Sequence, residues 1–107
     1  MKIFMKAINP LSRFRKGAIL THILYHASKE PVYGSWLKEE LQKHGYNISD
    51  GTLYPWLNRL EYSKYLKVEK RNVEGKIRKY YTITEKGLQI FNQIRRFLQE
   101  LYNEIID

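Results

Sequence analysis

A short segment that begins at Ser49 carries side chains whose chemistry suits the recognition of DNA. The apolar stripe of this segment, if it is a helix, comprises Leu53, Trp56, Leu57 and Leu60. Thr52, Tyr54 and Asn58 fall largely off that stripe. Asn can form two hydrogen bonds with adenine, and Thr or Tyr can meet a thymine methyl group or a phosphate. The alternative is that Tyr54 packs at the edge of the domain; we favour DNA contact for this polar face.

The first turn of the same segment could bind a phosphate. Ser49 is a good N-cap residue, and a hydroxyl at a helix N-terminus can also contact a phosphate. Asp50 would sit poorly against phosphate, so a favourable interaction with the helix dipole is its expected role. Gly51 and Thr52 complete the first turn and belong to the predicted DNA contacts. Pro55 lacks a backbone N–H, and we expect it to loosen the first turn without breaking the helix.

Basic residues downstream could hold the DNA backbone. The predicted phosphate contacts are Arg71, Lys76, Arg78 and Lys79. Such contacts position a protein on DNA but do not read its sequence. Strand alternation puts Arg78 and Lys79 on opposite faces, so they are not expected to touch the same phosphate. The alternative is a solvated hairpin edge protected by lysines. Tyr33 is a further predicted backbone contact, with simple packing as its alternative.

Other chemistry finds little support. His22 and His26 are four residues apart, but two imidazoles without a carboxylate or thiolate nearby make a poor metal site, and His44 is not evidently close. The chain has no cysteine, which excludes disulfides and thiolate ligands. No catalytic arrangement stands at an interpretable spacing. The sequence therefore predicts no enzyme activity, no metal and no cofactor.

Charge is concentrated on two segments. The 107 residues carry a net charge of +8, of which residues 1–16 and 64–79 together supply +10 and the rest of the chain −2. Solubility charge would be scattered, whereas concentrated positive charge is typical of a polyanion binder. The apolar run at the start is too short for a signal peptide, and no stretch is long enough to span a bilayer. We expect a cytoplasmic protein with no membrane partner.

Apolar spacing and cap residues predict the helices that position these side chains. Apolar residues recur at three- and four-residue steps from about Leu11 to Ser28, and Asn9-Pro10 or Ser12 can open this first helix. A second helix is expected from about Gly34 to His44. Its predicted inward residues are Trp36, Leu37 and Leu41.

A hairpin and a long helix are expected after the third helix. Two alternating runs, 66–68 and 81–83, flank the turn signal Asn72-Val73-Glu74-Gly75. Thr84 then caps the last helix and Glu85 complements its dipole. The predicted fold class is mainly α with a small β-hairpin, a winged helix-turn-helix in the order α-α-α-β-β-α. In that fold the third helix enters the DNA major groove and the hairpin reaches the flanking backbone.

The last predicted helix is apolar over roughly half of its circumference, wider than the ~100° stripe that one core needs. A small domain cannot bury all of this surface, so part of it is available to a second copy of the chain. We therefore expect residues 1–83 to form the DNA-binding domain, with 1–10 as a basic arm. Residues 84–107 would form a C-terminal dimerisation helix packed on the same domain.

In four segments the chain resembles the PadR-like transcriptional regulators. The matching segments are Tyr33-Gly34; Gly51-Thr52-Leu53-Tyr54-Pro55 with Leu57 and Arg59-Leu60-Glu61; Arg78-Lys79-Tyr80-Tyr81; and Thr84-Glu85-Lys86-Gly87. The resemblance runs from about residue 14 to the C-terminus and implies a repressor of the short branch of the family, without a second C-terminal domain. It also implies dimerisation through the last helix. The predicted dimer interface comprises Phe14, Ile90, Phe91, Ile94, Phe97, Leu98, Leu101, Tyr102 and Ile105.

The predicted function is that of a sequence-specific, dimeric repressor that binds an inverted-repeat operator in double-stranded DNA. The resemblance places a cleft for a small aromatic or hydrophobic effector at the dimer seam. The predicted cleft residues are Phe14, Ala18, Phe91, Ile94 and Leu98. Two alternatives remain open: a protein-interaction module whose basic charge is incidental, and an architectural DNA binder that has no effector.

Overall fold

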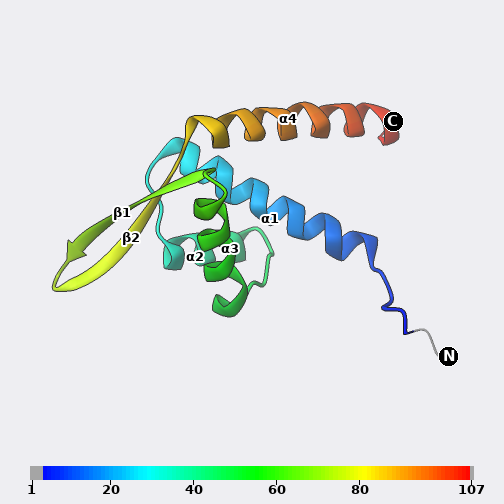
Figure 1. The fold of residues 1–107 in the computed structure, drawn as a ribbon. Coiled ribbons are helices and arrows are strands. Elements are labelled where there is room, and N and C mark those ends of the chain that lie inside the picture. Colours follow the sequence, from blue (N-terminus) through cyan, green and yellow to red (C-terminus); the bar gives the residue numbers. More distant parts are fainter. Residues whose placement is uncertain (1–3, 107) are drawn as a thin grey trace.

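The computed structural model describes residues 4–106, and its elements follow the predicted order (Figure 1). The helices are α1 (Pro10–Lys29), α2 (Gly34–Lys43), α3 (Asp50–Tyr62) and α4 (Glu85–Ile105), and the strands are β1 (Leu66–Val73) and β2 (Lys76–Ile83). The mainly helical winged helix-turn-helix is therefore confirmed. The first two helices end within one residue of their predicted bounds. Of the predicted arm, residues 1–3 lie outside the described residues.

Two of the predicted helix caps form as expected. The Asn9 side chain accepts a hydrogen bond from the Ser12 N–H (3.1 Å) at the start of α1. The Thr84 hydroxyl accepts one from the Gly87 N–H (2.9 Å) at the start of α4. Both side chains satisfy a backbone donor that has no partner within the helix.

The start of α3 differs from the prediction. Ser49 occupies the N-cap position, but its hydroxyl bonds the Thr52 hydroxyl (3.2 Å) and makes no cap hydrogen bond to the backbone. Asp50, which was expected to act through the helix dipole, also pairs with Lys38 of α2 (2.9 Å). This exposed ion pair joins the two helices of the helix-turn-helix. α3 continues through Pro55 without a break, as expected.

One apolar core joins α1, α2, α3, the hairpin and the start of α4. Its buried residues are Ile19, Ile23, Leu24, Ala27, Val32, Leu37, Leu41, Ile48, Leu53, Leu57, Leu66, Tyr81 and Phe91. Trp36 and Trp56, predicted to face inward, are only half-buried and pack against this cluster, as does Leu60. The leucines, not the tryptophans, therefore fill the centre.

The hairpin is anchored to the segment between α1 and α2. Val32 and Tyr81 exchange two backbone hydrogen bonds, of 2.9 and 2.7 Å, which form a single antiparallel bridge at the edge of β2. At the far end, Glu74 and Gly75 form a two-residue turn in which both have positive φ (52° and 82°). A turn of this hand matches the twist of the strands. The anchoring holds Tyr33, the next residue, beside the hairpin.

α4 lies along α1, and the two helices pack together (Figure 1). Its buried residues are Gly87 and Phe91, both in its first half. Beyond them Ile94 and Leu101 are half-buried, and three larger side chains stay open to solvent, with Phe97 59%, Tyr102 58% and Ile105 63% exposed. The hairpin tip and the C-terminal end of α4 point to opposite sides of the molecule (Figure 1). Surfaces on these two elements can therefore act independently.

Candidate nucleic-acid interface

A polar groove of about 640 Å³ runs between α3, the start of α2 and the hairpin. Its lining residues are Tyr33, Gly34, Ser35, Tyr54, Asn58, Val73, Glu74, Lys76, Ile77, Arg78, Lys79 and Tyr81. The fold thus brings together six residues that the sequence predicted as DNA contacts from three separate segments. Burial raises the pKa of Tyr81 at this groove, so its hydroxyl stays protonated.

Tyr54 lies at the junction of α2 and α3. Its ring covers Gly34 so closely that a Cβ at Gly34 would lie 2.8 Å from Tyr54 Cζ and 2.9 Å from Tyr54 Oη. The ring nevertheless remains 42% exposed. Tyr54 therefore both packs on α2 and presents an open surface to the groove, so its two predicted roles are compatible. The close approach explains why position 34 holds a glycine.

Arginines on the hairpin are held by aromatic rings. The Arg78 guanidinium lies over the Tyr33 ring at 4.1 Å, and that of Arg71 lies over the Tyr80 ring at 4.3 Å. Tyr33 and Tyr80 meet edge to face at 5.5 Å. Arg71 and Arg78 are also direct cross-strand partners, and Glu69 pairs with Arg71 at 3.2 Å. Like charges placed opposite each other repel, and the rings and this carboxylate offset part of that cost.

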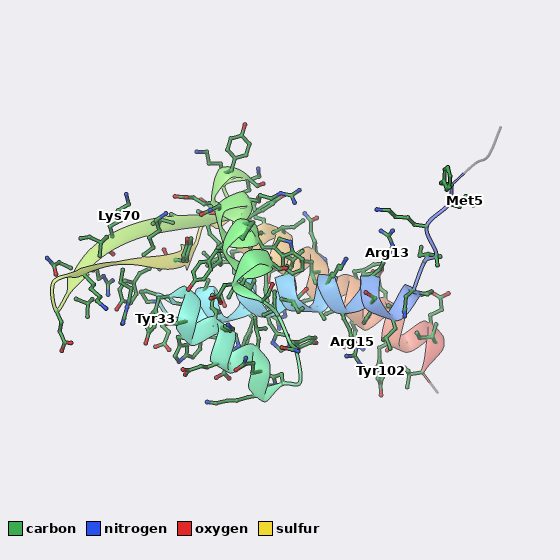
Figure 2. The ribbon with its side chains drawn as sticks, turned by 90° about the horizontal axis from the view of Figure 1, so that it is seen from below. Met5, Arg13, Arg15, Tyr33, Lys70 and Tyr102 are labelled. Carbon is green, nitrogen blue, oxygen red and sulfur yellow. The ribbon has the colours of Figure 1, made fainter. Side chains whose placement is uncertain are left out.

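Strand register separates the remaining basic residues as alternation predicted. Lys70 pairs with Lys79, and this pair lies on the face opposite Arg71 and Arg78. Figure 2 shows Lys70 on one side of the hairpin and Tyr33 on the other. The hairpin thus carries positive charge on both faces, which suits an element that has DNA phosphates on both of its sides. Lys70 and Tyr80 were not among the predicted site residues, although the alternating pattern of the hairpin contained that signal.

The first turn of α3 does not open into this groove. Ser49 and Thr52 line a separate hollow of about 410 Å³, together with Arg15 and Lys16 of α1. Eight of the ten predicted contacts therefore fall into two patches, whereas Gly51 and Arg71, which are both exposed, line neither of them. Arg15 and Lys16 were counted only as part of the basic N-terminal segment. Their approach to α3 depends on how α1 packs, which local sequence patterns do not predict.

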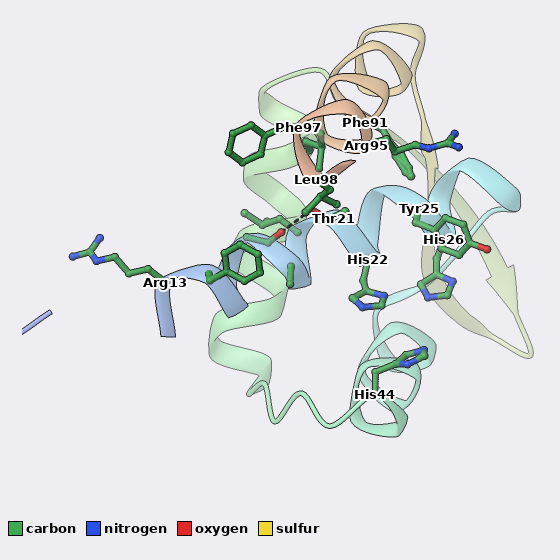
Figure 3. Close-up of a pocket in the computed structure, with 15 residues that line it drawn as sticks. Arg13, Thr21, His22, Tyr25, His26, His44, Phe91, Arg95, Phe97 and Leu98 are labelled. Atoms are coloured by element: carbon green, nitrogen blue, oxygen red, sulfur yellow. Dashed lines mark hydrogen bonds between the residues drawn. The ribbon is translucent and has the colours of Figure 1, made fainter. Parts of the chain in front are cut away.

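An apolar groove of about 700 Å³ lies on another part of the molecule, between α1 and α4 (Figure 3). All of the predicted cleft residues line it: Phe14, Ala18, Phe91, Ile94 and Leu98. Phe97 and Arg95 contribute from α4, and Tyr25 lies beside Phe91 with ring centroids 6.2 Å apart. Phe14 is 54% exposed and Leu98 40% exposed, so this groove is open along its rim.

The histidines depart from the sequence prediction. His44 was not expected near His22 and His26, yet one ring nitrogen from each of the three lies within 4.8 Å of the others. His44 stands at the end of α2, and α2 packs beside α1. The cluster forms through tertiary packing, which the spacing of His22 and His26 alone could not reveal.

Comparison with known proteins identifies the fold family. The family model described as the transcriptional regulator PadR-like family matches residues 23–93. The chain belongs to this family. This PadR-like protein is 43% identical over 96 residues to the transcriptional regulator Rv3488 of Mycobacterium tuberculosis (strain ATCC 25618 / H37Rv), a match that covers 90% of each chain.

Solved structures agree with this assignment. A PadR family transcriptional regulator from Eggerthella lenta DSM 2243 has a TM-score of 0.80 and 33% identity, covering 89% of this chain and 84% of that one. A PadR-like transcriptional regulator from Bacillus cereus strain ATCC 14579 has a TM-score of 0.78 and 34% identity, covering 87% and 92%. The chain is therefore a transcriptional regulator of the PadR-like type, as the resemblance implied. No helix within residues 4–106 has the length and apolar character that a membrane crossing requires.

Proposed function

We propose that this PadR-like regulator is a dimeric repressor that reads an inverted-repeat operator through α3 and grips the adjacent backbone with its hairpin. The observation that carries the proposal is the groove that the exposed face of α3 shares with the arginine-bearing hairpin. A winged helix binds DNA by placing the second helix of its helix-turn-helix, here α3, in the major groove. The family assignment agrees with a role in transcription.

Within this proposal the predicted contacts have two tasks, which are to meet base edges and to bind phosphate. Tyr54 and Asn58 face base edges, where an Asn side chain can form two hydrogen bonds with adenine. The remaining contacts bind phosphate: Tyr33, Ser49, Gly51, Thr52, Arg71, Lys76, Arg78 and Lys79. Stacking on Tyr33 restricts the Arg78 side chain before DNA arrives, so less conformational entropy is lost on binding.

Dimerisation through α4 supplies a second copy of α3, which binds the second half-site of the operator. The apolar side chains that α4 leaves open support this role, because Phe97, Tyr102 and Ile105 are each more than half exposed. The proposed interface comprises Phe14, Ile90, Phe91, Ile94, Phe97, Leu98, Leu101, Tyr102 and Ile105. Residues 84–107 then serve as the dimerisation helix of a chain whose residues 1–83 bind DNA. Twofold symmetry requires half-sites about one helical turn, ~34 Å, apart.

Release of the operator would follow from a small aromatic or hydrophobic molecule in the α1–α4 groove. This groove borders the proposed dimer interface, since Phe14, Phe91 and Leu98 belong to both. A ligand that prefers a dimer with the wrong half-site spacing would shift the population away from DNA.

Fluorescence anisotropy tests the DNA-binding part of this proposal. Labelled duplex from the region upstream of the gene, and a scrambled duplex, are titrated with protein at several salt concentrations. We expect tight binding to the native duplex alone, weakening steeply as salt rises. Equal binding to both duplexes would indicate an architectural protein, and no binding at low salt would refute the proposal.

An Arg78→Ala variant sharpens the same experiment. Because a dimer carries two copies of this residue, the slope of log K against log salt should become shallower by about 2, at roughly 0.9 per phosphate contact. Lys43→Ala is the matched control, since it removes one positive charge at the far end of α2, where Lys43 pairs with Glu40. An equal change in both variants would mean that net charge alone drives binding.

A further inference from the structure

Three imidazoles from two helices meet at the wall of the α1–α4 groove, which all three line. His22 and His26 stand one turn apart on α1, and both side chains leave α1 on the side that faces His44 at the end of α2 (Figure 3). One ring nitrogen from each histidine lies within 4.8 Å of the other two. Neither DNA recognition by α3 nor pairing through α4 uses these side chains.

An ordinary packing role leaves one of them unexplained. His26 Nε2 is buried and has no hydrogen-bond partner among the described residues. Leaving such a buried polar atom unsatisfied costs about 1–3 kcal/mol. Aromatic neighbours surround its ring, with Tyr25 at 5.1 Å and Trp36 at 5.3 Å between ring centroids, and they do not bond this nitrogen. A ligand that accepts an imidazole lone pair would satisfy it.

Burial favours the neutral form of two of the three histidines, His22 and His26. Burial is the main cause that lowers the pKa of His22 and of His26; His44 lowers both further, whereas Glu40 raises both. Neutral imidazole coordinates metal, whereas imidazolium does not. His22 also stacks on His44, with ring centroids 5.0 Å apart.

A carboxylate lies beside one member of the cluster, His44. Glu40, one turn before His44 on α2, has Oε1 3.6 Å from His44 Nε2. Two ligands of a tetrahedral zinc ion at 2.0–2.1 Å are about 3.3 Å apart, so this pair already stands near a coordination distance. The other oxygen of Glu40 lies 3.6 Å from Lys43 Nζ, whose side chain is exposed, so solvent weakens this ion pair.

We propose that His22, His26, His44 and Glu40 bind a divalent transition-metal ion of the zinc, nickel or cobalt class. Imidazole and carboxylate ligands suit these ions, and no thiolate is available in this chain. Closing the nitrogens from within 4.8 Å to about 3.3 Å requires small side-chain rotations, which the exposed His44 can make. The ion ties α1, which lines the effector groove, to α2 of the helix-turn-helix.

Metal titration of the full chain without DNA tests this proposal. Protein stripped with a chelator is titrated with Co²⁺, followed by visible absorption, and with Zn²⁺, followed by calorimetry and thermal unfolding. We expect one ion per chain, the visible bands of low-symmetry Co²⁺, and a higher Tm with Zn²⁺. The absence of both bands and heat from folded protein at tenfold excess metal would overturn the proposal.

Matched variants locate the ion. His44→Gln and His22→Gln should each weaken Zn²⁺ binding by at least about tenfold, because each removes one of four ligands. Glu39→Gln, a neighbouring exposed acid of α2, should bind like the wild type. Unchanged affinity in both histidine variants would place the ion elsewhere and refute the site.

NMR of the histidine rings in the wild-type protein tests the site without any variant, so it applies even if a variant fails to fold. In wild-type protein, Zn²⁺ should shift the ring ¹⁵N resonances of all three histidines together at one equivalent. Shifts confined to one histidine would contradict the cluster. Since none of these measurements contains DNA, their failure would leave the proposed repressor function untouched, and the anisotropy experiment tests that function separately.

Discussion

Gly34→Ala isolates the contact between the helix-turn-helix and Tyr54. The new Cβ would lie 2.8 Å from Tyr54 Cζ and 2.9 Å from Tyr54 Oη, whereas ordinary carbon contacts are about 3.5–4.0 Å. The ring must therefore retreat by roughly 1 Å. It can do so because it is the free end of a side chain that is 42% exposed.

The two consequences differ in size. Position 34 begins α2, where alanine gains up to ~1 kcal/mol of helix propensity over glycine, and this gain offsets the cost of moving the ring. The free energy of unfolding should stay within about 1 kcal/mol of the wild type. If displacement removes a Tyr54 contact worth ~1 kcal/mol in each half-site, the dimer loses ~2 kcal/mol, or about 30-fold in DNA affinity.

Urea denaturation and fluorescence anisotropy measure these two quantities, and a double-mutant cycle tests the reasoning. We expect Tyr54→Ala to weaken DNA binding as much as Gly34→Ala does, and the double variant to bind no worse than Tyr54→Ala alone. Additive losses would show that Gly34 acts independently of Tyr54. Wild-type affinity in Gly34→Ala would remove Tyr54 from the proposed DNA interface.

Other predictions concern stability, assembly and pH. Gly87→Ala should lower the free energy of unfolding by several kcal/mol, because its Cβ would strike a backbone carbonyl that cannot retreat; a loss below 1 kcal/mol in urea denaturation would contradict this. Phe97→Glu should yield monomers in light scattering while Asn103→Glu stays dimeric; a dimeric Phe97→Glu would exclude this part of α4 from the interface. Burial lowers the pKa of His22 and of His26 below 6.5, so the unfolded chain binds these protons at a higher pH than the folded chain does. The free energy of unfolding should therefore fall as pH drops below about 6.5. A constant free energy of unfolding from about pH 7.5 to 5.5 would contradict this prediction.

Local chemistry in the sequence was sufficient for the fold. Periodic apolar residues place the helices, and the cap residues Asn9 and Thr84 mark their starts, because both signals act within a few residues of the chain. The same signals were insufficient at Ser49. Its hydroxyl could bond either the backbone or the Thr52 side chain, and the structure has the second arrangement.

The sequence patterns did not predict the contacts between residues on different helices. Trp36 is half-buried because it stands beside His26 at the rim of the core, although its helical spacing predicted an inward position. The covering of Gly34 by Tyr54, and the approach of His44 to His22, join residues that are more than 15 positions apart. Such contacts depend on how α1, α2 and α3 cross, and no periodicity along one element contains that information.

The central claim is that two copies of α3 read neighbouring major grooves while the hairpins hold the flanking backbone. Hydroxyl-radical footprinting of the bound upstream duplex, combined with interference by N7 methylation of purines in the major groove, tests it most directly. We predict two protected half-sites that are related by a twofold axis and lie about 34 Å apart. Methylation at the centre of either half-site should prevent binding of the protein. In Arg78→Ala the protection of the flanking backbone should be lost. A single or uniform footprint that major-groove methylation leaves unchanged would contradict the claim.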